Sequence, residues 1–279
     1  MDGKALAERV RSEVAEEVRE LGELGLATVL VGDDPASDIY IKRKHEAAQE
    51  VGIVTRDSRL PSDTSEEKLL ELVGHLNGDD AIDGILIQLP LPEHIDEARV
   101  IRAIEPIKDV DGFHPFNAGH LYLGKPTHVP ATPLGVMTML EEYAVELQGA
   151  NAVVVGRSNI VGKPMAMMLL HAHATVTICH SRTRDLVEHT RRADVLVVAI
   201  GHYGVVGPDH VKEGATVIDV GINRTDEGLR GDVDPATAEV AGLITPVPGG
   251  VGPMTIATLL RNTVRAARYR RRLLAFPGG

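Results

Sequence analysis

The sequence predicts an α/β protein built from two α/β domains. Short apolar runs alternate with amphipathic stretches along the chain, as expected for helices packed on mostly parallel sheets. The 279 residues are long for one domain, and 43% hydrophobic with 25% charged residues is ordinary for a globular protein. We expect a first domain over residues 1–134, a second over 135–253, and a last helix, 254–279, packed back on the first domain.

Helices and strands alternate through the first domain. Residues 3–24 carry apolar side chains at helical spacing, and 26–31 form an apolar run that ends at a glycine, which indicates a buried strand. A helix over 37–51 follows, with Ser37 as the expected N-cap and Gly52 as the stop. The remaining elements are a weak strand over 53–60, a helix over 65–76 capped by Ser62 or Thr64, and a strand over 85–87.

The helix over 37–51 places a phenol and an amine on one face. Tyr40 and Lys44 are four residues apart, the spacing at which helical side chains are neighbours. Burial lowers the pKa of a lysine toward neutrality, so such a pair can transfer protons. The spacing alone is more typical of an ordinary amphipathic helix, and the segments that follow decide between the two interpretations.

Two later segments place polar groups beside the predicted sheet. Gln88 directly follows the last strand, just before two prolines that end it, and so lies at a strand's carboxyl end, where parallel sheets bind ligands. Residues 106–120 are rich in Asp, Gly, Pro and His and predict a functional loop. Asp109 and Asp111 in this loop either form a turn or supply a ligand-binding carboxylate, and the loop position favours the second interpretation.

The second domain shows a βαβαβ pattern, which is typical of nucleotide-binding domains. A helix over 132–143 precedes strands expected at 151–155, 175–179, 195–200 and 216–220. Gly156, Arg157 and Ser158 begin the loop after the first of these strands, where backbone N–H groups can bind a pyrophosphate. The two glycines of this loop are six residues apart rather than in a GxGxxG pattern, so a βα turn without a ligand is the alternative.

The end of the next strand bears on the choice of cofactor. An NAD site usually has an acid at this position to bind the ribose hydroxyls, whereas this chain has Ser181 and Arg182. With Arg157 expected nearby, the pocket suits a 2′-phosphate and favours NADP over NAD. The alternative is a pair of solvated arginines.

The segment over 245–253 is a rigid turn that opens the last helix. Its three glycines permit close approach of a ligand to the backbone, and a tight connector without a ligand is the alternative. Five arginines between Arg265 and Arg272 are interpreted as the solvated face and final turn of that helix.

Composition excludes several classes of function. A net charge of −11 argues against a nucleic-acid binder, and no apolar run is long enough for a membrane span. The single cysteine, Cys179, and scattered histidines predict no metal site. The first 18 residues lack the apolar core of a signal peptide, so we expect a cytoplasmic protein.

The chain is identified by resemblance as a member of the bifunctional methylenetetrahydrofolate dehydrogenase/cyclohydrolase family. The segments that carry the resemblance are, in order, YIKRKHEAAQEVGI, GILIQLPLP, KDVDGFHPFNAGHL, TPLG, VVVGRSNIVGKPMA, DVGIN and PVPGGVGPMT. They span nearly the whole chain, and KDVDGF and PGGVGPMT are the most specific. The resemblance implies two packed α/β domains with a cleft between them, the second a Rossmann-like NADP-binding domain. It implies a homodimer that acts in the one-carbon metabolism serving purine biosynthesis. It also implies NADP-dependent oxidation of 5,10-methylenetetrahydrofolate, then hydrolysis of the methenyl product to 10-formyltetrahydrofolate.

The same resemblance implies roles for individual residues. Lys44 is the general acid/base, Tyr40 lines the folate and braces the lysine, Gln88 tunes the lysine, and Asp111 anchors the pterin. The substrate-binding residues are Tyr40, Lys44, Gln88, Leu89, Asp111, Pro248, Gly249 and Gly250. The cofactor-binding residues are Gly156, Arg157, Ser158, Ser181, Arg182 and Ile222. Ala131 replaces a cysteine that the family usually has, so that thiol is not essential here.

Three other functions are weighed against this one. A short-chain dehydrogenase also uses Tyr-x-x-x-Lys, but there the nucleotide-binding unit precedes the motif, whereas Tyr40 precedes Gly156. For a dehydrogenase-only relative, or one acting on another pterin, the presence of Lys44, Gln88 and Asp111 favours the bifunctional enzyme instead. A non-catalytic NADP-binding regulator predicts cofactor binding without turnover, and it gives no reason for these three residues to converge outside the nucleotide-binding domain.

Overall fold

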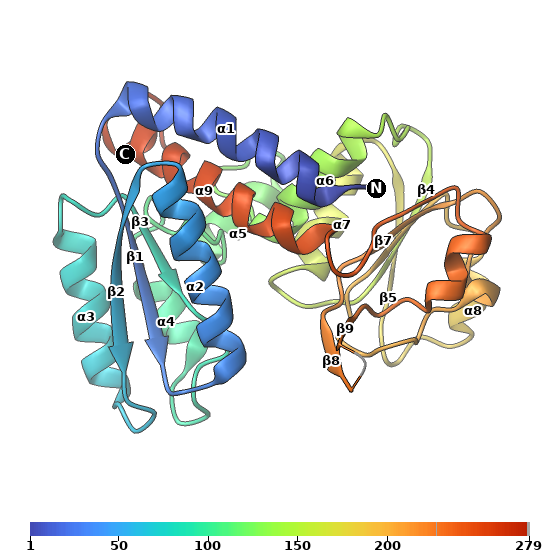
Figure 1. The fold of residues 1–279 in the computed structure, drawn as a ribbon, viewed down its shortest axis with the longest axis horizontal. Coiled ribbons are helices and arrows are strands. Elements are labelled where there is room, and N and C mark those ends of the chain that lie inside the picture. The colour runs from blue at the N-terminus through green and yellow to red at the C-terminus, as the bar shows by residue number, and fades with distance from the viewer. Residues whose placement is uncertain (227, 278–279) are drawn as a thin grey trace. The chain divides into compact units, whose positions relative to one another are not determined.

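The computed structural model describes residues 1–226 and 228–277 and divides into two compact units (Figure 1). Unit 1 comprises Met1–Ala7 and Thr132–Thr255, and unit 2 comprises Glu8–Ala131 and Ile256–Gly279. Each unit has its own parallel sheet flanked by helices, which confirms the α/β fold class.

The sheet of unit 2 has three parallel strands in the order β2-β1-β3. Its strands are β1 (Leu24–Val31), β2 (Ile53–Leu60) and β3 (Gly84–Ile87). The central strand β1 is buried along its whole length, so both faces of the sheet must be covered. The helices are α2 (Pro35–Glu50), α3 (Glu66–Gly78), α4 (Glu97–Ala103) and α5 (Pro115–Tyr122), with most of α1 (Gly3–Leu21) and α9 (Val251–Arg270).

Alternation along β1 assigns helices to its two faces. Ala27, Val29 and Val31 form one core cluster with apolar residues of α3 and α4. Successive strand residues point to opposite faces, so Thr28 faces the other way. There its Oγ1 lies 2.8 Å from Nε2 of His45, a residue of α2. Helix α2, which carries Tyr40 and Lys44, is therefore anchored to the central strand.

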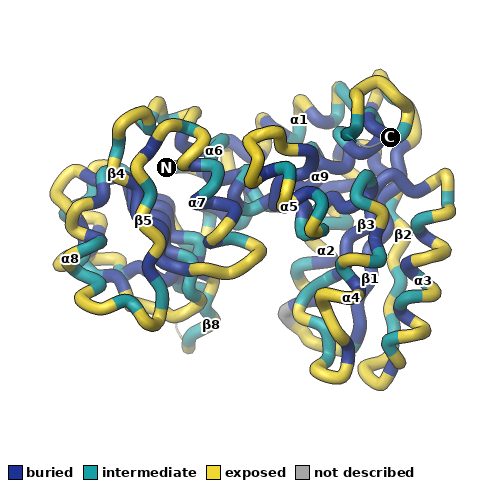
Figure 2. Tube along the Cα trace, turned by 180° about the vertical axis from the view of Figure 1, so that it is seen from behind, coloured by how far each residue is buried: buried dark blue, intermediate teal, exposed yellow. Residues whose placement is uncertain are grey.

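Unit 1 contains a five-stranded parallel sheet in the order β10-β7-β6-β4-β5. Counted along the chain, this is the 2-1-3-4-5 order of a doubly wound fold, with its switch point between β4 and β6. The central strands β4, β6 and β7 are largely buried, the edge strand β10 is half-buried, and the side chains of the edge strand β5 are largely exposed (Figure 2). The elements are α6 (Ala131–Glu142), β4 (Asn151–Val155), α7 (Gly162–His171), β5 (Thr175–Cys179), α8 (Leu186–Thr190), β6 (Val195–Val198), β7 (Thr216–Asp219) and β10 (Leu243–Ile244). Two 3₁₀ turns, η1 (Pro208–His210) and η2 (Pro235–Glu239), and a ribbon of β8 (Asn223–Thr225) with β9 (Gly228–Arg230) complete the unit.

Two expected helix caps were wrong. Asp34, not Ser37, is the N-cap of α2, because its carboxylate accepts from the backbone N–H of Ser37 at 2.9 Å. Ser37 lies inside the helix and donates its hydroxyl to the same carboxylate. Helix α3 is capped by Ser65, whose hydroxyl accepts from the N–H of Lys68, and not by Ser62 or Thr64 as expected.

The segment over 106–120 is not entirely loop, contrary to expectation. Its second half belongs to α5, which has Pro115 in its first turn. His114 caps this helix, with Nδ1 accepting from the N–H of Phe116 at 3.0 Å. The eight-residue helix is too short for its apolar period to stand out in the sequence.

The solvated face expected at the end of α9 is only partly observed, because Arg268, Arg270 and Arg271 bind groups of unit 2, whereas Arg272 is exposed in the turn after the helix. Arg270 pairs with Asp83 at 2.7 Å, and Arg268 with Glu17 at 2.8 Å. Arg271 donates to the backbone carbonyls of Leu21 and Glu23.

Among the described residues, no helix is both long and apolar enough to cross a membrane.

Candidate functional site

Helix α2 and the end of β3 bring a lysine and a glutamine together in unit 2. Nζ of Lys44 donates to Oε1 of Gln88 at 3.0 Å. The glutamine's Nε2 donates to the carbonyl of Leu89 at 2.8 Å, which fixes the amide with its oxygen toward the lysine. Gln88 is thus an acceptor held in place for the ammonium.

Burial shifts the proton affinities of three groups around this pair. It lowers the pKa of Lys44, and the negative charge of Asp111 opposes that shift. It raises the pKa of Asp111 to about 7; the charge of Lys44 opposes this rise and Asp109 adds to it. Tyr40, half-buried one turn earlier on α2, has a raised pKa because burial outweighs the effect of Arg43. Lys44 and Asp111 therefore titrate closer to neutral pH than exposed side chains do.

The two acids of the DVDG segment have different surroundings. The carboxylate of Asp109 is occupied within its own loop, where it accepts from the N–H groups of Phe113 and His114 and from Nδ2 of Asn117. Asp111 carries the electrostatic coupling to Lys44. Gly112 has φ +70°, and a Cβ there would lie 2.7 Å from the carbonyl carbon of Val129, so the turn after Asp111 requires glycine.

Two residues that the sequence did not single out position this loop. Lys108 is buried, and its ammonium donates to three backbone carbonyls at the end of α3; its own carbonyl accepts from the N–H of Ile85 in β3. Asn262, on α9, donates from Nδ2 to the carbonyls of Val110 at 2.8 Å and Val129 at 2.9 Å. Their partners are backbone atoms, which leave no signal in a sequence.

Unit 1 contains a pocket of about 450 Å³ at the carboxyl ends of β4, β5 and β6. This is the switch point of the sheet, where doubly wound folds bind ligands. Four of the predicted cofactor residues line it: Gly156, Arg157, Ser158 and Ser181. The structure does not place Arg182 or Ile222 in its wall: Arg182 is exposed beyond the turn at His180, and Ile222 is 43% exposed.

The loop after β4 is folded tightly on itself. Gly156 has φ +135°, and a Cβ there would lie 2.3 Å from the carbonyl oxygen of Ala199. A Cβ on Gly162 would lie 2.3 Å from the carbonyl oxygen of Gly156. The N–H groups of Val161 and Gly162 donate to Oγ of Ser158, at 3.1 and 3.2 Å. These helix-terminal donors, expected to face a pyrophosphate, are therefore already partnered.

The predicted turn at 248–250 packs closely within unit 1. Gly249 has φ +106°, and Pro248 is exposed. Gly250 is buried, and a Cβ on it would lie 2.6 Å from the carbonyl oxygen of Pro246. Part of the glycine content of this turn thus serves packing.

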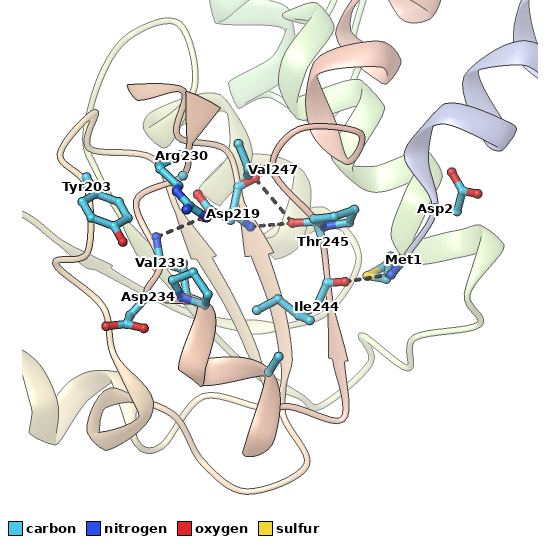
Figure 3. A pocket seen from close by; sticks show the side chains of 14 residues that line it. Met1, Asp2, Tyr203, Asp219, Arg230, Val233, Asp234, Ile244, Thr245 and Val247 are labelled. Carbon is cyan, nitrogen blue, oxygen red and sulfur yellow. Dashed lines mark hydrogen bonds between the residues drawn. The ribbon is translucent and has the colours of Figure 1, made fainter. Parts of the chain in front are cut away.

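A second pocket in unit 1, of about 610 Å³, is lined by none of the predicted site residues (Figure 3). Asp219, at the end of β7, lies in its wall beside Arg230 and Thr245. Burial raises the pKa of Asp219 to about 6, and hydrogen bonds from three backbone N–H groups oppose that rise.

Within residues 1–226 and 228–277, no group of three or more His, Cys, Asp or Glu side chains is arranged to hold a metal ion.

Comparison with known proteins gives matches over nearly the whole chain. The family model for the tetrahydrofolate dehydrogenase/cyclohydrolase catalytic domain matches residues 1–111, and the model for the NAD(P)-binding domain matches 130–271. The bifunctional protein FolD of Burkholderia thailandensis is 58% identical over 273 residues, covering 96% of each chain.

Solved structures agree with these matches. The bifunctional FolD of Campylobacter jejuni is 49% identical with a TM-score of 0.95, covering 96% of this chain and 98% of the other. The Trypanosoma brucei methylenetetrahydrofolate dehydrogenase-cyclohydrolase, solved with NADP and an inhibitor, is 38% identical with a TM-score of 0.93, covering 98% of each chain.

Proposed function

The chain belongs to the tetrahydrofolate dehydrogenase/cyclohydrolase family, the bifunctional enzymes of folate one-carbon metabolism, and on that premise we propose how its residues divide the two reactions. Unit 2 holds the folate and transfers protons, and unit 1 holds the nicotinamide cofactor. The oxidation converts 5,10-methylenetetrahydrofolate to the methenyl cation, and the hydrolysis converts that cation to 10-formyltetrahydrofolate.

Lys44 is the proton-transfer residue of the hydrolysis. Water attacks the methenyl carbon, and ring opening then requires a proton to leave the water and another to reach the departing nitrogen. A lysine whose pKa is lowered by burial can do both near neutral pH, and the hydrogen bond to Gln88 at 3.0 Å aims its nitrogen. This pairing of a buried amine with a fixed acceptor is the single observation that carries the proposal.

The remaining residues of unit 2 bind the folate. Asp111 accepts hydrogen bonds from the pterin and, when ionised, favours the cationic intermediate. Tyr40 covers the ring system one turn from Lys44, and Leu89 adds an apolar contact beside Gln88. By family correspondence, Pro248, Gly249 and Gly250 are also assigned to substrate binding.

The pocket of unit 1 fits NADP. Gly156 lets the loop pack against the carbonyl of Ala199, which holds Arg157 and Ser158 in the pocket wall. Ser181 stands where an acid would select NAD, and Arg157 is exposed in the same pocket wall and can bind a 2′-phosphate. Arg182 and Ile222 remain assigned to cofactor binding at the edge of this site, outside the pocket wall. When bound, NADP supplies the acceptor for the hydride of the first reaction.

The proposal is tested by comparing Lys44→Met with Lys42→Met. Both lysines lie on α2, but Lys42 is exposed and forms only a surface pair with Glu46 at 3.9 Å. We expect Lys44→Met to lower the rate of methenyltetrahydrofolate hydrolysis about 10²- to 10⁴-fold, the usual contribution of a general acid/base. Lys42→Met should hydrolyse it at the wild-type rate.

Each possible result has a defined meaning. Hydrolysis at the wild-type rate by Lys44→Met would refute the role of the lysine. Another result is that wild-type protein reduces NADP with methylenetetrahydrofolate while the methenyltetrahydrofolate formed is hydrolysed only at the uncatalysed rate. That result would indicate a dehydrogenase alone. Reduction of NAD in preference to NADP would refute the assignment of Ser181 and Arg157.

The protein also forms a homodimer in this proposal. Support comes from the edge strand β5, where Thr175, Thr177 and Ile178 are exposed and one side of the strand has no neighbour in the sheet. Light scattering on the purified protein should give twice the mass of the chain. Ile178→Lys should give a monomer, whereas Leu273→Lys, at another exposed apolar site, should remain dimeric.

A cytoplasmic location belongs to the same proposal, because the reactions consume 5,10-methylenetetrahydrofolate and NADP, which are metabolites of the cytoplasm. Fractionation of cells with an antibody against the protein tests it. Recovery in a membrane or exported fraction would contradict it.

A further inference from the structure

A buried carboxylate outside the cofactor pocket holds one wall of that pocket in place. We propose that Asp232 is a positioning residue for the dehydrogenase reaction, acting through the peptide of Ile200 and Gly201. The inference rests on the proposed function of unit 1 as the NADP site. It concerns a residue that touches neither substrate nor cofactor.

The carboxylate of Asp232 is fully buried and fully used. Oδ2 accepts from the backbone N–H of Ile200 at 2.7 Å and from that of Gly201 at 2.9 Å. Oδ1 accepts from Nδ2 of Asn223 at 2.9 Å, and the same amide nitrogen donates to the carbonyl of Gly231 at 3.1 Å. One side chain therefore joins the end of β6 to the β8–β9 ribbon.

The backbone of Asp232 is fixed in turn by Asp219. Oδ1 of Asp219 accepts from the N–H of Asp232 at 2.9 Å and from that of Gly221 at 3.0 Å. Oδ2 accepts from the N–H of Val233 at 3.0 Å (Figure 3). Thr245 closes the far side, with Oγ1 accepting from the N–H of Asp219 at 2.8 Å. The two acids thus form a relay of hydrogen bonds from β10 and β7 to β6.

Gly221 and Gly231 leave the space in which these carboxylates approach the backbone. A Cβ on Gly221 would lie 2.2 Å from Oδ1 of Asp232, and a Cβ on Gly231 would lie 1.7 Å from Oδ2 of Asp219. Neither glycine has positive φ, so close packing rather than turn geometry requires them. Backbone and carboxylates fit each other tightly enough that a small displacement of Asp232 must move the segments around it.

The segment that Asp232 holds is part of the cofactor pocket. Ala199, Ile200, His202 and Val205 line it opposite the loop that begins at Gly156. Extended pairing with β4 ends at Ala199, whose N–H donates to Val155 at 2.8 Å. Beyond it, the next two N–H groups are held by Asp232 instead of by a strand, so this carboxylate sets the path of the wall.

A carboxylate is needed because both oxygens accept hydrogen bonds. In Asp232→Asn, one oxygen is replaced by an NH₂ group, so a donor faces a donor whichever way the amide turns. Either the Ile200 and Gly201 peptides or the Asn223 amide loses its partner. The change keeps the shape of the side chain, so it tests hydrogen bonding and charge rather than volume.

The experiment compares Asp232→Asn with Asp234→Asn, two residues along the chain. Asp234 caps the η2 turn, accepting from the N–H of Ala236 at 2.9 Å, and is not part of the pocket wall. We expect Asp232→Asn to raise the KM for NADP about tenfold, the effect of losing a buried hydrogen bond to a charged group, with kcat changed by less than about twofold. The hydrolysis of methenyltetrahydrofolate, measured without cofactor, should stay within about twofold of wild type. Asp234→Asn should match wild type in all three measurements.

Two further variants keep the test decisive. In the double variant Asp232→Asn with Asn223→Asp, the new amide can donate to the new carboxylate while its oxygen accepts from Ile200 and Gly201. The KM for NADP should fall part of the way back to wild type, because the carbonyl of Gly231 still lacks the donor that Asn223 supplied. A general loss of folding would not produce such a recovery. If Asp232→Asn does not fold, Asn223→Ala removes the partner of Oδ1 alone and should raise the KM for NADP by about threefold.

The outcomes separate this inference from the proposed function. An unchanged KM for NADP in Asp232→Asn and Asn223→Ala would overturn the inference while leaving the function intact. An equal loss of hydrolysis and NADP reduction in Asp232→Asn would also overturn it, because the role would then be structural. Wild-type protein that reduces neither NADP nor NAD would instead overturn the proposed function of unit 1.

Discussion

Replacing Lys108 with methionine should destabilise unit 2 by ~1–3 kcal/mol, the cost of leaving a buried acceptor unsatisfied, although the residue lies on a loop. The side chain is 2% exposed, and its ammonium donates to the carbonyls of Leu76 at 3.0 Å, Asn77 at 2.6 Å and Asp79 at 2.9 Å. The carbonyls of Leu76 and Asp79 also accept from backbone N–H groups, at 3.4 and 3.1 Å, whereas that of Asn77, at the end of helix α3, relies on the ammonium. Methionine has a similar volume but no donor.

The magnitude follows from two opposing effects. Each hydrogen bond from a charged donor contributes ~1.5–3 kcal/mol, whereas burying the ammonium costs several kcal/mol. Burial lowers the pKa of Lys108, which is the signature of that cost. Removing the ammonium leaves neutral carbonyls rather than an unpaired charge, and a buried acceptor left unsatisfied costs ~1–3 kcal/mol. We expect a loss in this range, and a fall in Tm of roughly 5 °C for a chain of this size.

Calorimetry on the variant measures the effect, with amide hydrogen exchange in α3 as a local readout. Lys68→Met is the matched control, since Lys68 is an exposed residue of the same helix and its substitution should change stability by less than ~0.5 kcal/mol. Exchange should accelerate first at the carboxyl end of α3. If Lys108→Met and Lys68→Met melt at the same temperature, water satisfies the carbonyls and the reasoning fails.

Three further outcomes are expected from unit 2. The KM for the folate should fall as pH rises through about 7 in wild type, where Asp111 ionises, and Asp111→Asn should abolish that dependence in steady-state assays across pH 5–9. Gly112→Ala should lower the free energy of unfolding by ~2 kcal/mol or more in thermal melts and lower both activities. Residue 112 has φ +70°, and the added Cβ would meet the backbone of Val129. Asp34→Ala should cost ~1 kcal/mol in urea unfolding by removing the cap on the N–H of Ser37; a cost near zero would show that water replaces it.

The alternation of helices and strands could be predicted from the sequence because it depends on local apolar patterns. Strands at 151–155 and 175–179 were placed at their observed bounds, since each apolar run is short and ends in polar residues. Helices α4 and α5, of seven and eight residues, were not predicted, because two turns are too few to show a 3.6-residue period. Neighbouring candidates for one cap, such as Ser62, Thr64 and Ser65, differ only in where the chain turns, which tertiary packing decides.

The candidate site was predicted where its chemistry lies in side chains and missed where it lies in the backbone. Lys44 and Gln88 carry recognisable groups on a helix and at a strand end, and the structure places them 3.0 Å apart. Lys108, Asn262 and Asp232 bind carbonyl or N–H groups of distant segments, and every residue has those groups. Only the folded chain reveals which of them lack a partner from secondary structure.

The division of the chain has a consequence for its biosynthesis. Unit 1 needs the first residues, Met1–Ala7, together with Thr132–Thr255, and unit 2 needs Ile256 and the residues after it in addition to Glu8–Ala131. On the ribosome, the β1–β3 sheet emerges early but must wait for α9, whose Asn262 holds the loop that carries Asp111. Neither unit can be completed until nearly the whole polypeptide has been synthesised, so nascent chains of this protein depend on protection from aggregation until translation ends.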